Sequence, residues 1–136
     1  MNDTLATALA AEEAAIYAYG VVGVKLPKAG EKDEARAAEL AHRNRRDYLV
    51  GRLTQPPAAP AGYQLPFPVT DRATALRLAI RVEDGVAQAW RPVLAVTRTA
   101  ERATALAALT DAAVRATRWR RLAGVVPMTM AFPGRV

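Results

Sequence analysis

The stretch TQPPAAPAGYQLPFPV, residues 54–69, holds five of the nine prolines in this chain of 136 residues. Each proline fixes φ and removes a backbone hydrogen-bond donor, so neither a helix nor a strand persists through the stretch. Tyr63, Leu65 and Phe67 alternate there with smaller or polar residues. This alternation favours an extended segment that lies against the rest of the protein. We therefore expect a long crossover between the two halves of the chain and not a linker between domains.

Apolar residues recur at helical spacing on both sides of this stretch. Glycine, proline and capping residues divide the pattern into helices over about 3–26, 31–53, 71–96 and 98–123, followed by a coil over 125–136. No strand-length alternation is bounded by hairpin signals. Two helices joined by a short turn, a long crossover and two more helices predict an all-α, four-helix bundle with the topology of ferritin-like folds.

Length and composition support one compact domain covering residues 1–136. The chain is 51% hydrophobic and 24% charged with a net charge of +6, which is typical of a globular protein and not of a disordered one. Its length suits one hydrophobic core and is short for two ordinary domains.

Residue types that are missing exclude several kinds of chemistry. The chain has no cysteine, so disulfides, thiolate metal sites and cysteine nucleophiles are excluded. It has no serine, which excludes a Ser-His-Asp triad, and only one histidine, His42. A metal site would therefore have to use His42 together with carboxylates.

The N-terminus carries no signal-peptide pattern, and no apolar run approaches the roughly 20 residues that cross a membrane. We expect a cytoplasmic protein without a membrane partner.

Carboxylates and the single histidine occur at a spacing that is typical of metal sites in helical bundles. Residues at i and i+3 of a helix project to the same side, and Glu-x-x-His steps of this kind hold iron in di-iron bundles. Glu39 and His42 form such a step in the second expected helix, Glu12 lies in the first and Glu83 in the third. Glu13 neighbours Glu12 and has a similar helical register, so either glutamate could face the interior.

The expected fourth helix departs from this pattern. After Glu101 it contains no glutamate or histidine, and its only acid is Asp111, which is followed three residues later by Val114. The ligands that the fourth helix would supply to a di-iron site are therefore missing.

Four stretches of the sequence resemble an actinobacterial ferritin-like domain family of unknown function. They are EEAAIYAYGVVG at 12–23, HRNRRD at 42–47, LPFPVTD at 65–71 and AWR at 89–91. The resemblance covers nearly the whole chain. It implies the ferritin-like bundle and dimerisation, and it implies no activity, because the family has none assigned. Ferritin-like iron chemistry would extend only to Glu12, Glu39, His42 and Glu83.

These observations lead us to expect a bundle of unassigned function, without catalysis and with a binding or structural role. The carboxylate and histidine site is then degenerate, and no cofactor is expected, although three ligands and water can hold a single Fe, Mn or Zn ion. The alternative is a metal-dependent oxidoreductase or iron-handling protein that uses this reduced site.

Binding partners are predicted only in outline. Exposed apolar residues in the first helix, the crossover and the C-terminal coil favour a homodimer. Arginines such as Arg43, Arg45 and Arg46 leave DNA binding of the mini-ferritin kind as a second alternative, although a solvated helix face is the commoner reason for such a cluster. The sequence does not identify a small-molecule ligand.

Overall fold

The computed structural model describes residues 2–135, and within that range it is all-helical. The helices are α1 (Asn2–Lys25), α2 (Ala29–Arg52), α3 (Arg72–Val96) and α4 (Thr99–Ala123). Residues 2–135 form four helices and no strand, so the expected all-α class is confirmed. The observed bounds lie within two residues of the expected ones.

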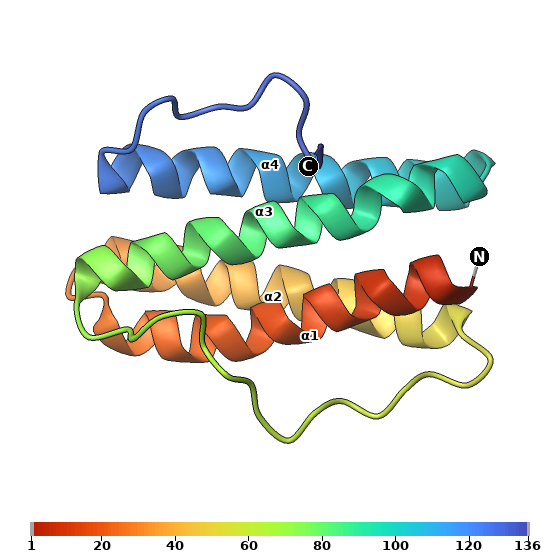
Figure 1. Ribbon diagram of the computed structural model, residues 1–136, viewed down its shortest axis with the longest axis horizontal. Coiled ribbons are helices and arrows are strands. Elements are labelled where there is room, and N and C mark those ends of the chain that lie inside the picture. The colour runs from red at the N-terminus through yellow and green to blue at the C-terminus, as the bar shows by residue number, and fades with distance from the viewer. Residues whose placement is uncertain (1, 136) are drawn as a thin grey trace.

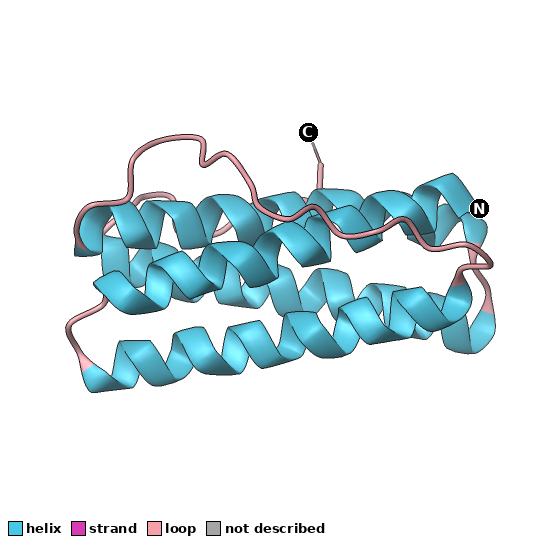
Figure 2. Ribbon diagram, turned by 90° about the horizontal axis from the view of Figure 1, so that it is seen from below, coloured by secondary structure: helices cyan, strands magenta, loops and turns pink. Residues whose placement is uncertain are grey.

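The helices lie side by side in a bundle (Figures 1 and 2). α1 and α4 run in one direction and α2 and α3 in the other. α1 packs against both α2 and α3, and α3 packs against α4. Because α2 and α3 are parallel, the chain between them has to return along the full length of the bundle, as Figure 1 shows.

The returning segment, residues 53–71, contacts the bundle through alternate side chains. Leu65, Phe67 and Val69 are partly buried and pack against a core cluster to which all four helices contribute. At the end of the segment Asp71 caps α3, because its carboxylate accepts from the backbone N–H of Thr74, while the hydroxyl of Thr74 lies 3.1 Å from the Asp71 nitrogen. The alternation in the sequence thus corresponds to contacts with the bundle.

The core consists of two apolar clusters at the two ends of the bundle. One is built around Leu9, Leu49 and Trp90, and the other around Leu76 and Trp119. Alanines fill many of the other buried positions, so the helices approach closely. Glu12, His42 and Glu83 occupy the level between the two clusters on their helices and are also fully buried. Polar groups in the middle of such a core need partners within the protein.

Among the described helices, α1 differs from our expectation that no segment is long and apolar enough to cross a membrane. Residues 3–25 of α1 are long and apolar enough to cross a membrane by length and composition alone, although we expected no such run. The cause is the alanine content of α1. The helix also buries Glu12 and Tyr19 against other helices, which is typical of a core helix in a bundle.

The C-terminal tail, residues 125–135, turns back over α4 (Figure 1), and its far end contacts Ala87 and Arg91 of α3. Gly124 ends α4 in the left-handed conformation, with φ of 70°. Gly134, with φ of 81°, is buried, and a Cβ there would lie 2.7 Å from the carbonyl oxygen of Ala87. Arg91 donates to the carbonyl oxygen of Pro133 at 3.3 Å. The tail is therefore fixed to α3 at its far end.

Candidate functional site

The imidazole of His42 lies at the centre of the bundle between two carboxylates. Its Nδ1 is 2.6 Å from Oε2 of Glu12 on α1, and its Nε2 is 2.9 Å from Oε2 of Glu83 on α3. All three side chains are at most 3% exposed. A ring that meets a carboxylate at both nitrogens donates to both of them only when it is protonated.

Glu12 is fully satisfied by its two neighbours. Its Oε1 accepts from the indole Nε1 of Trp90 at 2.8 Å, and its Oε2 faces His42. Trp90 lies on α3 and is completely buried. This side of the cluster therefore has no unsatisfied oxygen.

Glu83 is only half satisfied. Its Oε2 accepts from the hydroxyl of Tyr19 as well as facing His42, and that hydroxyl in turn accepts from Nε1 of Trp119 at 2.8 Å. Its Oε1 is buried and has no hydrogen-bond partner in the structure. The hydrogen bonds thus run from Trp90 to Trp119 and connect all four helices.

A second cation approaches the free oxygen of Glu83. Nη1 of Arg115 on α4 lies 3.7 Å from Oε1, a distance typical of an ion pair and too long for a hydrogen bond. Asp111, one turn earlier, holds the same guanidinium through two hydrogen bonds of 3.0 and 3.2 Å. Only 13% of the Arg115 side chain is exposed. The buried carboxylates therefore face one cation from α2 and another from α4.

These contacts determine the charge of His42. Burial lowers the pKa of the imidazole, but the hydrogen bonds and charges of Glu12 and Glu83 outweigh burial and raise this pKa to about 9. His42 is therefore an imidazolium at neutral pH. For Tyr19, burial first and then Glu83 raise the pKa well above its usual value of 10, so the phenol stays protonated and continues to donate.

Three of the four expected site residues come together, and Glu39 does not. Glu39 lies on the solvent side of α2, where it accepts from Nε of Arg43 at 3.1 Å in an exposed pair. The i, i+3 spacing predicted that Glu39 and His42 lie on the same side of α2. The buried face of α2 around His42 consists of Ala35, Ala38 and Leu49. Glu39 therefore lies at the edge of the buried face. The choice between Glu12 and Glu13 is resolved in favour of Glu12, because Glu13 is only partly buried.

The arrangement does not fit a metal ion. The ring of His42 lies between the carboxylates, and both of its nitrogens are already engaged, so the donors do not converge on a common point. Among residues 2–135 no group of three His, Asp or Glu side chains has the geometry to hold a metal. The protonated imidazole of His42 occupies the space between the two carboxylates.

Trp90, Trp119 and Arg115 are members of the cluster that their sequence context did not reveal. Trp119 stands among Arg118, Arg120 and Arg121 in the sequence, but it is 1% exposed. The signal that could have revealed both tryptophans is the need of a buried indole N–H for an acceptor. Arg115 stands at i+4 from Asp111, a spacing that is typical of an ordinary surface pair on a helix.

The fold and the site together define the class: a four-helix bundle with a charged cluster in its core. The family model described as domain of unknown function DUF4439 matches residues 4–136, so the chain belongs to this family. The family has no assigned function. No curated protein matches the chain.

A solved structure shows the same fold. The chain is similar to the crystal structure of a conserved hypothetical protein, rv2844, from Mycobacterium tuberculosis, with 44% sequence identity and a TM-score of 0.84. The similarity covers 89% of this chain and 95% of the other.

Proposed function

We propose that the protein is a ferritin-like bundle without catalytic activity, in which protonated His42 and Arg115 provide the positive charge that metal ions supply in di-iron bundles. The observation that carries this proposal is the contact of both His42 ring nitrogens with carboxylates, at 2.6 and 2.9 Å. The cluster then holds four helices in register, and the role of the protein is structural or one of binding.

The charges support this interpretation. The buried carboxylates of Glu12 and Glu83 face His42, and Glu83 also faces Arg115, which it shares with Asp111. Burying one carboxylate without a partner costs several kcal/mol, so carboxylates that face cations are the form that such a core tolerates. An additional divalent cation would have to displace the proton of His42 and move its ring.

Elemental analysis tests the proposal directly. The protein is purified without a metal-chelating tag, incubated with Fe²⁺, Mn²⁺ or Zn²⁺ and dialysed, and the variant His42→Ala is treated in the same way. We expect less than about 0.1 metal ion per chain in both samples. One ion per wild-type chain that is lost in the variant would instead support a metal-dependent oxidoreductase or iron-handling protein.

One observation favours that second candidate. Oε1 of Glu83 is buried without a hydrogen-bond partner, and an unsatisfied carboxylate oxygen is a potential metal ligand. The approach of Arg115 at 3.7 Å already supplies positive charge there, which is why we rank this candidate second.

We further propose that the protein forms a homodimer through the outer face of α1. Tyr17, Gly20 and Val24 lie on that face at helical spacing and are exposed, Val24 by 73%. A Cβ on Gly20 would meet no atom within 4 Å, so the space above this residue is open to another helix. Light scattering at micromolar concentration should give twice the chain mass for the wild type and for Leu40→Glu, an exposed position on α2, and a single chain mass for Val24→Glu.

Nucleic-acid binding is supported less well. Arg43 pairs with Glu39, and Arg46 pairs with Asp47, so the cluster around residues 43–46 is partly neutralised within the chain. If the protein did bind DNA, retardation at low salt would have to fall steeply as salt is raised.

A further inference from the structure

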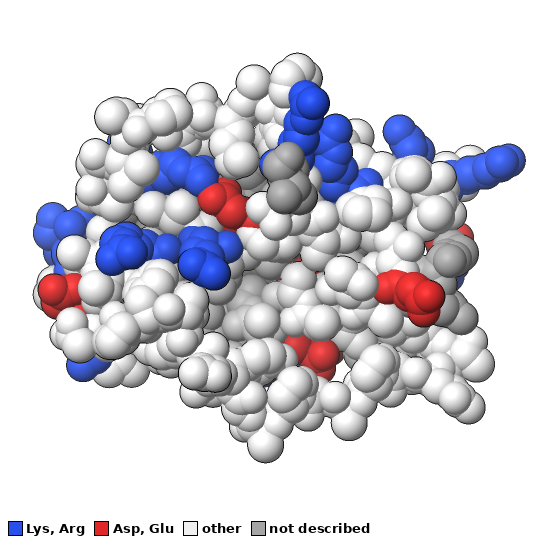
Figure 3. Space-filling model, in the orientation of Figure 1, with Lys and Arg blue, Asp and Glu red and all other residues white. Residues whose placement is uncertain are grey.

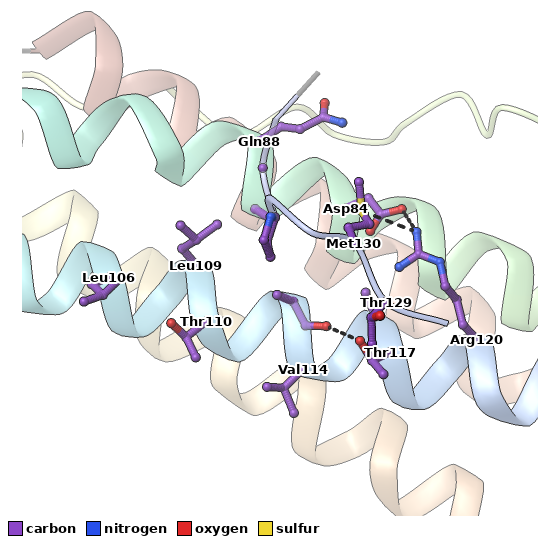
Figure 4. A pocket seen from close by; sticks show the side chains of 15 residues that line it. Asp84, Gln88, Leu106, Leu109, Thr110, Val114, Thr117, Arg120, Thr129 and Met130 are labelled. Atoms are coloured by element: carbon purple, nitrogen blue, oxygen red, sulfur yellow. Dashed lines mark hydrogen bonds and ion pairs between the residues drawn. The ribbon is translucent and has the colours of Figure 1, made fainter. Parts of the chain in front are cut away.

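A cavity of about 390 Å³ lies between α3, α4 and the C-terminal tail, away from the His42 cluster (Figure 4). Its α4 wall carries Leu106, Leu109, Ala113 and Val114, and the tail contributes Met130. This lining is mostly apolar, and the volume is in the range of small-ligand sites in proteins. All the residues that line the cavity belong to one chain, and it is open to solvent beside Leu106, which is 53% exposed.

The C-terminal tail covers part of this cavity because its far end is held on α3. Gly134 packs on the α3 backbone so closely that any side chain would collide with Ala87, and its φ is positive. Between Gly124 and Gly134 the tail passes over α4, and Met130 lies over the cavity next to Arg120 (Figure 4). Met130 remains 41% exposed, although it is apolar, so the tail covers the cavity without filling it.

A cationic groove adjoins the apolar cavity. Arg77 and Arg81 on α3 line it, and they are exposed and form no ion pair within residues 2–135. Arg77 lies over the ring of Phe67, 4.6 Å from its centroid, so it is held at the rim. Figure 3 shows basic side chains gathered over the first half of α3 on this face.

The two spaces meet at one ion pair. Asp84 and Arg120 pair with each other and border both the apolar cavity and the groove. The Asp84–Arg120 pair carries no net charge. Arg81 of the groove is three residues from Asp84, or about 4.5 Å along the axis of α3, so the groove begins within one helical turn of the cavity. An apolar space and an unpaired cationic space therefore lie next to each other along α3.

We propose that this face binds a single-chain amphiphile with an anionic head, such as a fatty acid or an alkyl phosphate. The alkyl chain occupies the cavity under the tail, and the head lies against Arg77 and Arg81. The unpaired guanidinium groups select the sign of the head, because charge-assisted hydrogen bonds to carboxylate or phosphate are the strong contacts that they can make. The site uses no residue of the His42 cluster and is independent of the role proposed for that cluster.

Calorimetric titration with soluble twelve-carbon probes tests the proposal. Dodecanoate and dodecyl phosphate, below their micellar concentrations, are compared with dodecyltrimethylammonium, which has the same chain and the opposite charge. We expect one anionic probe per chain, bound about tenfold or more tightly than the cation. The stronger of the two anions indicates whether the head is a carboxylate or a phosphate.

Three variants separate the two parts of the site. The double variant Arg77→Gln, Arg81→Gln should weaken the anionic probes about tenfold and leave the cation unchanged. Ala113→Phe, which fills the cavity, should abolish binding of all three probes, whereas Arg118→Gln on the exposed side of α4 should change nothing. Circular dichroism and thermal melting show whether each variant is folded.

Equal binding of the two signs of head group, no binding of either anion, or full binding by a folded Ala113→Phe variant would overturn the proposal. If the probes fail and a folded Ala113→Phe variant changes the mass measured by light scattering, the cavity is an interface with a second copy and not a ligand site.

Discussion

Nη1 of Arg115 on α4 lies 3.7 Å from Oε1 of Glu83 on α3, the one oxygen of the buried cluster that has no hydrogen-bond partner. The contact brings a second cation, from α4, to a cluster whose other cation, His42, comes from α2.

Replacing Arg115 should therefore destabilise the protein. We expect Arg115→Leu to lower the free energy of unfolding by about 2–4 kcal/mol, because it removes one of the two cations that face the buried carboxylates. Urea unfolding followed by circular dichroism measures the change. Arg118→Leu, three residues further along the same helix and exposed, is the matched control and should stay within about 0.5 kcal/mol of the wild type. An equal effect of the two variants would argue against a role for Arg115 in the core.

Stability should also depend on pH through His42. The pKa of His42 is about 9 in the folded protein and close to 6.5 in the unfolded chain. Since the folded pKa is the higher one, the stabilisation is fully present below pH 6.5 and is lost as the pH rises through 9. The loss amounts to about 3 kcal/mol.

Unfolding at pH 6, 7.5, 9 and 10 in matched salt measures this dependence, with the variant His42→Gln as the control. The variant should be less stable than the wild type at pH 6 and should lack the decline between pH 6.5 and 9. A wild type whose stability does not change over that interval, or falls in parallel with the variant, would show that His42 is not charged in the folded protein.

The hydroxyl of Tyr19 has two partners, Glu83 and Trp119, and its removal should cost each of them one hydrogen bond. Tyr19→Phe deprives Glu83 of a donor and Trp119 of an acceptor, so we expect a loss of about 1–3 kcal/mol. Tyr17→Phe, at a half-exposed position two residues earlier, should have little effect. Absorbance of tyrosinate offers a second measurement, because Tyr19 should resist ionisation until the pH is well above 10.

Much of the architecture could be predicted from the sequence, since helix periodicity, prolines and capping residues act locally. The five prolines of residues 54–69 were enough to predict a long connection in the middle of the chain, and glycine, proline and capping residues were enough to predict the helix bounds. Glu12, His42 and Glu83 were also identified, because carboxylates and a histidine on apolar helix faces are conspicuous.

The remainder of the cluster could not be predicted for a physical reason. Glu39 has the correct spacing from His42, but the face that a helix buries depends on its rotation against its neighbours, which one sequence does not specify. Arg115 and Trp119 come from a fourth helix whose register against α3 is set by packing. Their long-range contacts with Glu83 and Tyr19 exist only in three dimensions.

The most direct test of the central claim is nitrogen-15 NMR of the single histidine, because one imidazole gives signals that need no assignment. We predict that both ring nitrogens of His42 carry protons at pH 7.5, that the ring titrates near pH 9, and that added Fe²⁺, Mn²⁺ or Zn²⁺ leaves these signals unchanged. A neutral ring at pH 7.5, or signals that are lost or shifted on addition of one equivalent of metal, would contradict the proposal that protonated His42 supplies positive charge in place of a metal ion.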